Sequence, residues 1–443
     1  MYSNIIKECM EKKNRIVSIF YGWILIQPFI DLLTSIDVRF EIFPVSVGII
    51  LRGIFLGAMA VYLVFINKKS SRTLSFVYLM LCAIYFALFI INKAENNSLI
   101  FVEITSIVKF FYFPIVFLGM YKFFDEYDVD YDKVFKTFVT NLIVISIMLL
   151  IPFITNTSFS SYPTRDDLTS VGWFFAPNEI SAIMIMLFPF FFYRFYGKMT
   201  GKRKLALLYV TFAFTVFFIA LLGTKVAFLG ILIVTVIFLL YAVISRVLKK
   251  KRHGNVSRFS VFLLIMCLVL PVSPAFQNVA NILSNMFDVE LPADNDSTIL
   301  SNRDVYLKEN WSVFAESTPK DQLLGIGFTV RNAHEPAVLR RIVEIDFFDL
   351  FLSGGIIGTI LFFLPILFIL IKETRNFRIK NILRLKTFSI GISAGLCLMI
   401  SWFAGHVFSS PAVSTYSAIA IVCLIGSFGR VGNAAESSDY DLL

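Results

Sequence analysis

The chain has 443 residues, of which 57% are hydrophobic, 16% aromatic and only 16% charged, and its mean hydropathy is +0.77. Soluble domains are about a quarter charged, so this composition excludes an ordinary soluble protein and favours one embedded in a lipid bilayer. The net charge of +9 does not indicate a nucleic-acid partner, because the basic residues lie in short segments between apolar runs, where they report membrane topology.

Apolar runs long enough to cross roughly 30 Å of hydrocarbon recur along the whole chain. We therefore predict an all-α polytopic membrane protein, in which residues 1–443 form a single transmembrane domain. About twelve helices are expected, near residues 16–35, 43–66, 74–92, 100–124, 134–154, 174–196, 204–222, 224–245, 258–276, 346–371, 388–407 and 411–429. The first run lacks a following small-residue cleavage site, so we interpret it as a retained span rather than a signal peptide.

Basic residues gather in alternate connections, such as NKKSSR, GKMTGKRK and KETRNFRIKNILRLK. The positive-inside rule then predicts a multi-pass protein of the cell membrane with both termini in the cytoplasm. Residues 277–345, between the ninth and tenth helices, form the one long loop, which falls on the extracytoplasmic side and should fold into short helices. Residues 430–443 are expected to form a polar cytoplasmic tail.

Five scattered cysteines show neither metal-ligand spacing nor a disulfide framework, so no metal and no cofactor is expected.

Ionisable groups near a bilayer are costly and are therefore functional candidates. Outside the stretch that opens the tenth helix, the candidates are Arg165, Asn178, Glu179, Lys225, Arg303, His334 and His406. Each also has a structural interpretation. Lys225 could snorkel to the headgroups, Arg303 could be a solvated loop charge, and Asn178 and Glu179 could favour the helix start after a proline. His406 could be a hydrogen-bonded residue at a helix end, and His334 a surface residue. Arg39 and Lys93 are expected to anchor helix ends.

The stretch RRIVEIDFFDLFLSGGIIG, residues 340–358, places Arg340, Glu344, Asp346 and Asp349 just before and within the start of the tenth helix. On a helix, Asp346 and Asp349 share a face and Glu344 points away. The three carboxylates can meet one cavity only if the helix begins near residue 346. Alternatively, the helix dipole stabilises them, Asp346 caps the helix, and Arg340 pairs with Glu344.

Several short, loosely defined motifs occur in a specific order along the chain. They are GWFFAPNEIS before the sixth helix, GTK at the hinge between the seventh and eighth, SNRDVYLKENW and LLGIGF in the long loop, and GGIIG in the tenth helix. Their order and topological placement resemble those of the O-antigen ligase and polysaccharide polymerase superfamily. The resemblance covers most of the chain. It implies a GT-C-like fold and metal-independent transfer of a glycan from a polyprenyl diphosphate carrier to an acceptor hydroxyl at the outer face.

The resemblance also implies partners and roles. The donor is a polyprenyl-diphosphate-linked oligosaccharide, the acceptor is a glycan or another cell-envelope molecule, and other polysaccharide-assembly membrane proteins are expected nearby. Arg303 and Lys225 would bind the diphosphate, with Arg165 behind them. Glu344 stands where relatives carry a histidine, and a carboxylate can also accept a hydroxyl proton. Asp346 is the other candidate base, with Asp349 orienting the two, while Asn178, Arg340, His334 and His406 are candidate substrate contacts.

Two other functions fit a chain of about twelve spans. A lipid-linked oligosaccharide flippase or another transporter is the main alternative, although such carriers tend to hold charges at mid-membrane, where this sequence shows few. A non-enzymatic membrane scaffold would leave the charges at the outer face unexplained. Polymerase and ligase share a donor and are not separated by the sequence.

Overall fold

The computed structural model describes residues 2–43, 45–66, 69–94, 99–161, 169–198, 202–249, 264–266, 268–273, 276, 303–330, 338–374 and 384–429. Their helices are α1 (Tyr2–Phe40), α2 (Val47–Val61), which continues into the π-helix η1 (Tyr62–Ile66), α3 (Lys69–Ala94), α4 (Ile100–Tyr127), α5 (Tyr131–Ile154), α6 (Pro177–Lys198), α7 (Lys202–Leu221), α8 (Lys225–Lys249), α11 (Arg303–Glu316), α12 (Pro319–Leu324), α13 (Asp346–Thr374), α14 (Leu385–Phe403) and α15 (Pro411–Gly429). The described residues also contain two short antiparallel strands, β1 (Thr329–Val330) and β2 (Val338–Leu339).

Nine helices in the described part of the chain are long and apolar enough to cross a membrane: α1, α2 with η1, α3, α4, α5, α8, α13, α14 and α15. The expectation of an all-α polytopic membrane protein is therefore confirmed. The count of about twelve stays a prediction, because the expected sixth and seventh helices, α6 and α7, are not among these nine, and the expected ninth helix, 258–276, falls largely outside the described residues. The same holds for the expected tail, 430–443, and for much of the expected loop, 277–345, whose described part contains α11 and α12.

The bundle has an aromatic interior built around α4, α6, α14 and α15. Among these nine helices, α15 is the most enclosed. In α15, 72% of the most apolar 18-residue stretch is buried, compared with only 22% in α2. Neighbouring rings pack edge to face or stacked, as Phe113 does on Phe117 and Phe362. Since lipid tails are as apolar as these side chains, close packing rather than avoidance of water stabilises such an interior. The outer helices leave their apolar side chains exposed, as expected for surfaces that face lipid.

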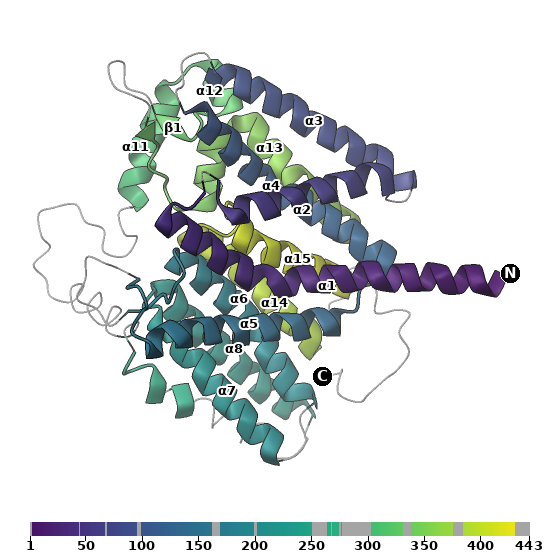
Figure 1. Cartoon of the computed structure of the whole chain (residues 1–443), viewed down its shortest axis with the longest axis vertical. Helices are drawn as coiled ribbons and strands as arrows, with labels where there is room; N and C mark the ends of the chain where they lie inside the picture. The colour runs from purple at the N-terminus through teal and green to yellow at the C-terminus, as the bar shows by residue number, and fades with distance from the viewer. Residues whose placement is uncertain are drawn as a thin grey trace, which may run out of the picture.

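Helices α11 and α12 and strand β1 lie together at one end of the bundle, and the N-terminus lies at the opposite end (Figure 1). We call the first of these the loop end. The buried carboxylate of Glu103, in the first turn of α4, accepts hydrogen bonds there from the backbone N–H groups of Phe328 and Thr329 at 2.9–3.1 Å. Lys93, at the end of α3, pairs with Asp321 of α12 at 2.9 Å. These two contacts fasten the loop segment to α3 and α4.

A kink in α13 completes this docking. Gly355 has φ 64° and ψ −171°, so the helix is interrupted there. A side chain at Gly355 would begin with a Cβ only 2.3 Å from the backbone nitrogen of Gly325. The segment after α12 runs beside the interruption, where Ile326 N–H donates to the Leu352 carbonyl at 3.0 Å. Glycine is required because the backbone conformation and the close approach both exclude a side chain.

Candidate functional site

Arg303 and Glu344 form an ion pair at the loop end. Arg303 is the first residue of α11, and its Nη2 lies 2.8 Å from Oε2 of Glu344. Its Nη1 donates to the carbonyl of Phe403 at 3.0 Å, at the end of α14. The Arg303 side chain is 12% exposed and that of Glu344 is 40% exposed, so the carboxylate is accessible while the guanidinium is mostly enclosed. The two residues are 41 positions apart, and folding brings them into contact.

Asp346 fixes the connection between α14 and α15. Its side chain is fully buried, and Oδ2 accepts hydrogen bonds from the N–H groups of Val407 and Phe408, both at 2.9 Å. Its Oδ1 accepts the hydroxyl of Ser409 at 2.6 Å. Helix α13 begins at Asp346, so Glu344 lies in the segment before it, the condition required for both to approach one site.

Asp349 and Arg340 also bind the protein's own chain. Asp349 accepts the N–H groups of Val343 at 2.8 Å and Ile345 at 3.2 Å, which shapes the segment that carries Glu344. Arg340 donates to the Gly327 carbonyl, to Asn310 Oδ1 at 2.7 Å and to the Ser353 hydroxyl.

Burial lowers the pKa of the Arg340 guanidinium, and the carboxylates of Asp349 and Glu103 oppose that shift. The suggested pairing of Arg340 with Glu344 is wrong, since Arg303 occupies that carboxylate and Arg340 points to other partners.

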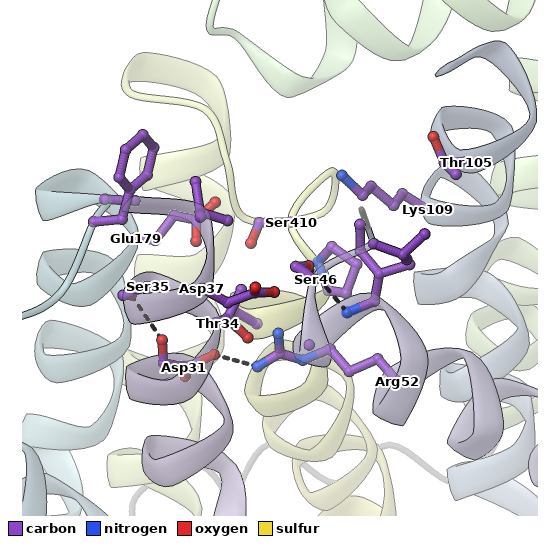
Figure 2. Close-up of a pocket in the computed structure, with 18 of the residues that line it drawn as sticks. Asp31, Thr34, Ser35, Asp37, Ser46, Arg52, Thr105, Lys109, Glu179 and Ser410 are labelled. Atoms are coloured by element: carbon purple, nitrogen blue, oxygen red, sulfur yellow. Dashed lines mark hydrogen bonds and ion pairs between the residues drawn. The ribbon is translucent and has the colours of Figure 1, made fainter. Parts of the chain in front are cut away.

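A cavity of about 970 Å³ opens beside this cluster, between α1, α2, α4, α6 and the start of α15. Three of the predicted site residues line it: Asn178 and Glu179 in the first turn of α6, and His406 in the connection before α15. Glu179 interacts with His406 and with the hydroxyl of Ser410. In Figure 2, Glu179 and Lys109 project toward the pocket from opposite sides, and Ser410 lies between them.

The backbone segment that carries Glu344 lies against the segment that carries His406, so the ion pair is close to the cavity. Gly405 lies directly before His406, and a side chain there would come within 2.6 Å of the Glu344 carbonyl oxygen. Glu344 and His406 adopt φ of 62° and 60°, in the left-handed region that non-glycine residues seldom occupy. Glu41, which lines the cavity, has φ 51°. Three of the five such residues in the described ranges therefore occur at this site, and strained backbone tends to gather at functional sites.

The remaining predicted site residues are Lys225, Arg165 and His334. Lys225 begins α8, next to Thr224, whose hydroxyl donates to Ser181 of α6 at 2.7 Å. Lys225 is not among the residues that line the cavity. Arg165 and His334 lie outside the described residues. Within those residues, no group of three or more histidine, cysteine or carboxylate side chains has a geometry that would hold a metal ion.

Sequence reasoning missed the charges at the base of the cavity. Asp31 of α1 and Arg52 of α2 form a buried ion pair, and Lys109 of α4 reaches toward the same space (Figure 2). Each of these residues stands within an apolar run, where a charge is costly. That rule alone would have singled them out, but which charges meet depends on how the helices pack.

Arg39, near the end of α1, contacts the segment that precedes α6. Its guanidinium lies 3.4 Å from the ring centroid of Phe159 and donates to the carbonyl of Phe174 at 3.1 Å.

The fold and the site together define a polytopic α-helical membrane protein with a charged cavity at one end of its bundle. A family model described as "O-antigen ligase like membrane protein" matches residues 13–289 and 283–429. The match covers most of the chain, which therefore belongs to the O-antigen ligase-like membrane protein family, whose general role is surface polysaccharide assembly. No curated protein matches the chain.

Proposed function

We propose that this protein is a glycosyltransferase that moves a glycan from a polyprenyl diphosphate carrier to an acceptor hydroxyl at the outer face of the cell membrane. Family membership supports lipid-linked glycan substrates. Both termini are then cytoplasmic, and the loop end faces outward. The product is a lengthened polysaccharide if the acceptor is another repeat unit, or a glycan attached to the cell envelope if it is not.

The observation that carries this proposal is the Arg303–Glu344 pair, which adjoins the cavity through the contact between the Glu344 backbone and Gly405, next to His406. A transfer from a diphosphate needs a cation for the leaving group and an acceptor for the hydroxyl proton. Arg303 and Glu344 supply these two functions within 2.8 Å of each other. The resemblance to the family implies that Glu344 stands where relatives carry a histidine, so in this proposal a carboxylate takes the place of an imidazole.

The proposed step is a single displacement. The acceptor oxygen attacks the anomeric carbon, the bond from that carbon to the diphosphate oxygen breaks, and the diphosphate remains on the lipid. A diphosphate that binds Arg303 displaces Glu344 from its present partner, and the released carboxylate accepts the hydroxyl proton. Lys225 contributes positive charge toward the leaving group as a point charge rather than as a bidentate fork. Protein cations carry the neutralisation in this proposal.

Asp346 and Asp349 serve as positioning residues. Their carboxylates are committed to backbone N–H groups of the segments that carry His406 and Glu344. This arrangement favours Glu344 as the proton acceptor over Asp346, since Glu344 is the more exposed of the two.

The experiment is deletion of the gene followed by analysis of the lipid-linked intermediates. Single repeat units that accumulate on the carrier at the outer face indicate a polymerase, and finished polymer left on its carrier indicates a ligase. Unchanged intermediates and unchanged surface polysaccharide would overturn the proposal.

The transporter alternative has one observation in its favour. The pair of Asp31 and Arg52, together with Lys109, places charges inside the helix bundle, as carriers often do. The same deletion separates the two functions, because loss of a flippase leaves repeat units on the cytoplasmic face of the membrane.

A further inference from the structure

The base of the cavity holds polar groups that the proposed transfer step does not use. The side chains of Asp31 and Arg52 are each 8% exposed. Arg52 uses Nη2 for both of its hydrogen bonds, to Asp31 and, at 3.5 Å, to Gln27. In the described part of the chain, Asp31 Oδ2 and Arg52 Nε are buried without a hydrogen-bond partner. Both atoms lie beneath the cavity surface, so a ligand would meet the Asp31–Arg52 pair as a whole rather than these two atoms.

The charge balance of the cavity limits what that ligand can be. Four carboxylates line it, those of Asp31, Asp37, Glu41 and Glu179, and its basic lining residues are Arg52, Lys109 and His406. Like charges repel strongly where little water separates them. The excess of carboxylates therefore disfavours a diphosphate or an acidic sugar in this space. An uncharged or amino-bearing ligand meets no such penalty.

Three exposed aromatic rings in the lining suit a carbohydrate. Phe43, Phe101 and Phe175 line the cavity and are 58%, 58% and 55% exposed. Their rings offer apolar faces to the C–H faces of a sugar, while carboxylates and the amide of Asn178 pair with hydroxyls. The volume of about 970 Å³ is at the upper end of the roughly 300–1,000 Å³ typical of small-molecule sites. There is room for several sugar units.

We propose that this cavity binds an oligosaccharide of uncharged or amino-bearing sugars, while the donor diphosphate lies outside it, beside Arg303. Arg303 is not among the residues that line the cavity. The inference rests on the proposed function, because it takes the substrates to be glycans. It adds which part of the substrate this cavity recognises and by what chemistry.

Two glycines of α2 provide a matched pair of test variants. Gly53 lines the cavity and Gly57, one turn further along, does not. A Cβ added at either position meets no atom within 4 Å, so both sites tolerate a side chain. Gly53→Phe places a ring in the cavity, and Gly57→Phe adds the same ring elsewhere on the helix. The smaller Gly53→Leu serves as a second blocking variant.

The measurement is binding of oligosaccharides to the purified full-length protein in nanodiscs. The probes are short, phosphate-free oligosaccharides prepared by partial hydrolysis of the cell's own surface polysaccharide. Wild type and Gly57→Phe should bind them equally, and Gly53→Phe should bind them at least about tenfold more weakly, equivalent to about 1.4 kcal/mol. A large excess of inorganic pyrophosphate should leave the binding unchanged.

Three results would overturn the inference: no saturable binding by the wild type, equal binding by Gly53→Phe and Gly57→Phe, or displacement of the oligosaccharide by pyrophosphate. These outcomes are separate from a failure of the proposed function, which the deletion experiment reports through lipid-linked intermediates. If the protein binds oligosaccharide but its deletion leaves those intermediates unchanged, the proposed binding site stands and the proposed transferase function is rejected.

Discussion

The carboxylate of Asp346 holds the backbone of Val407, 61 residues further along the chain, with 2.9 Å between Oδ2 and the amide nitrogen. The same carboxylate accepts the Ser409 hydroxyl at 2.6 Å. These bonds tie the start of α13 to the connection between α14 and α15. Glu344 lies two residues before Asp346 and His406 one residue before Val407, so this contact sets the distance between the ion pair and the cavity.

The first prediction concerns this tie. Asp346→Asn keeps the shape of the side chain but turns one acceptor into a donor that faces N–H and O–H groups. We expect a loss of about 1–3 kcal/mol of stability, because buried hydrogen bonds to a charged carboxylate are replaced by weaker bonds to a neutral amide. Thermal unfolding of the detergent-solubilised protein measures it, and Ser409→Ala should lose less. Residual polymer formation should keep the wild-type pH profile, since a positioning residue does not change which group takes the proton. A shifted profile would instead assign the base to Asp346.

The second prediction concerns the proton acceptor. Glu344→Gln should lower polymer formation by about 10²–10⁴-fold, the usual effect of removing a general base, while the amount of protein in the membrane stays normal. Glu344→His should retain more activity than Glu344→Gln, because an imidazole can accept the proton. The control is Glu316→Gln, at an exposed carboxylate of α11. Polymer of wild-type length and amount from Glu344→Gln cells would contradict the assignment.

The third prediction separates the two adjacent arginines. Arg340 is buried and donates to Asn310 Oδ1 and to the carbonyl of Gly327, so Arg340→Met should cost about 3 kcal/mol of stability by leaving these acceptors unpaired. Arg341 is exposed, with its Cζ 3.9 Å from the ring centroid of Tyr306. Arg341→Met should cost only about 0.5–1 kcal/mol, the value of an exposed cation–π contact. Equal thermal midpoints for the two variants would refute this difference.

The fourth prediction concerns pH. Burial raises the pKa of Asp321, but hydrogen bonds from Lys93, Thr318 and Asn92 outweigh it and hold the pKa below its ordinary value of 3.8. A carboxylate whose pKa is lowered by folding stabilises the protein above its ordinary pKa and loses that contribution as the pH falls through the lowered pKa.

The Asp321 side chain is 28% exposed, so the contribution should not exceed about 1 kcal/mol. Asp321→Asn should therefore lower the thermal midpoint at neutral pH, and the difference from wild type should shrink only below pH 3.8. If the difference in thermal midpoint stays constant down to strongly acidic pH, the charge of Asp321 does not contribute to stability.

Part of the candidate site could be read from the sequence. Charged residues next to apolar runs predicted a helix start near residue 346. The same pattern singled out Arg303, Glu344 and His406 as candidate site residues. The partners did not follow, because Arg340 lies four residues from Glu344 yet bonds to Asn310, and Glu344 pairs with a residue 41 positions away. Local spacing predicts contacts within one helix, and these contacts are made between helices.

The sequence by itself determined the membrane class and, for most of the described helices, their approximate bounds. A run of apolar residues of bilayer length has one stable conformation in lipid, since only a helix satisfies its backbone there. The tertiary structure decided which charges share a cavity. Asp31 and Arg52 stand on different helices 21 residues apart, and each is tolerable inside the bundle only because packing supplies the other. Whether a given carboxylate holds the backbone, as Asp346 does, or remains accessible, as Glu344 does, was likewise set by what folding placed beside it.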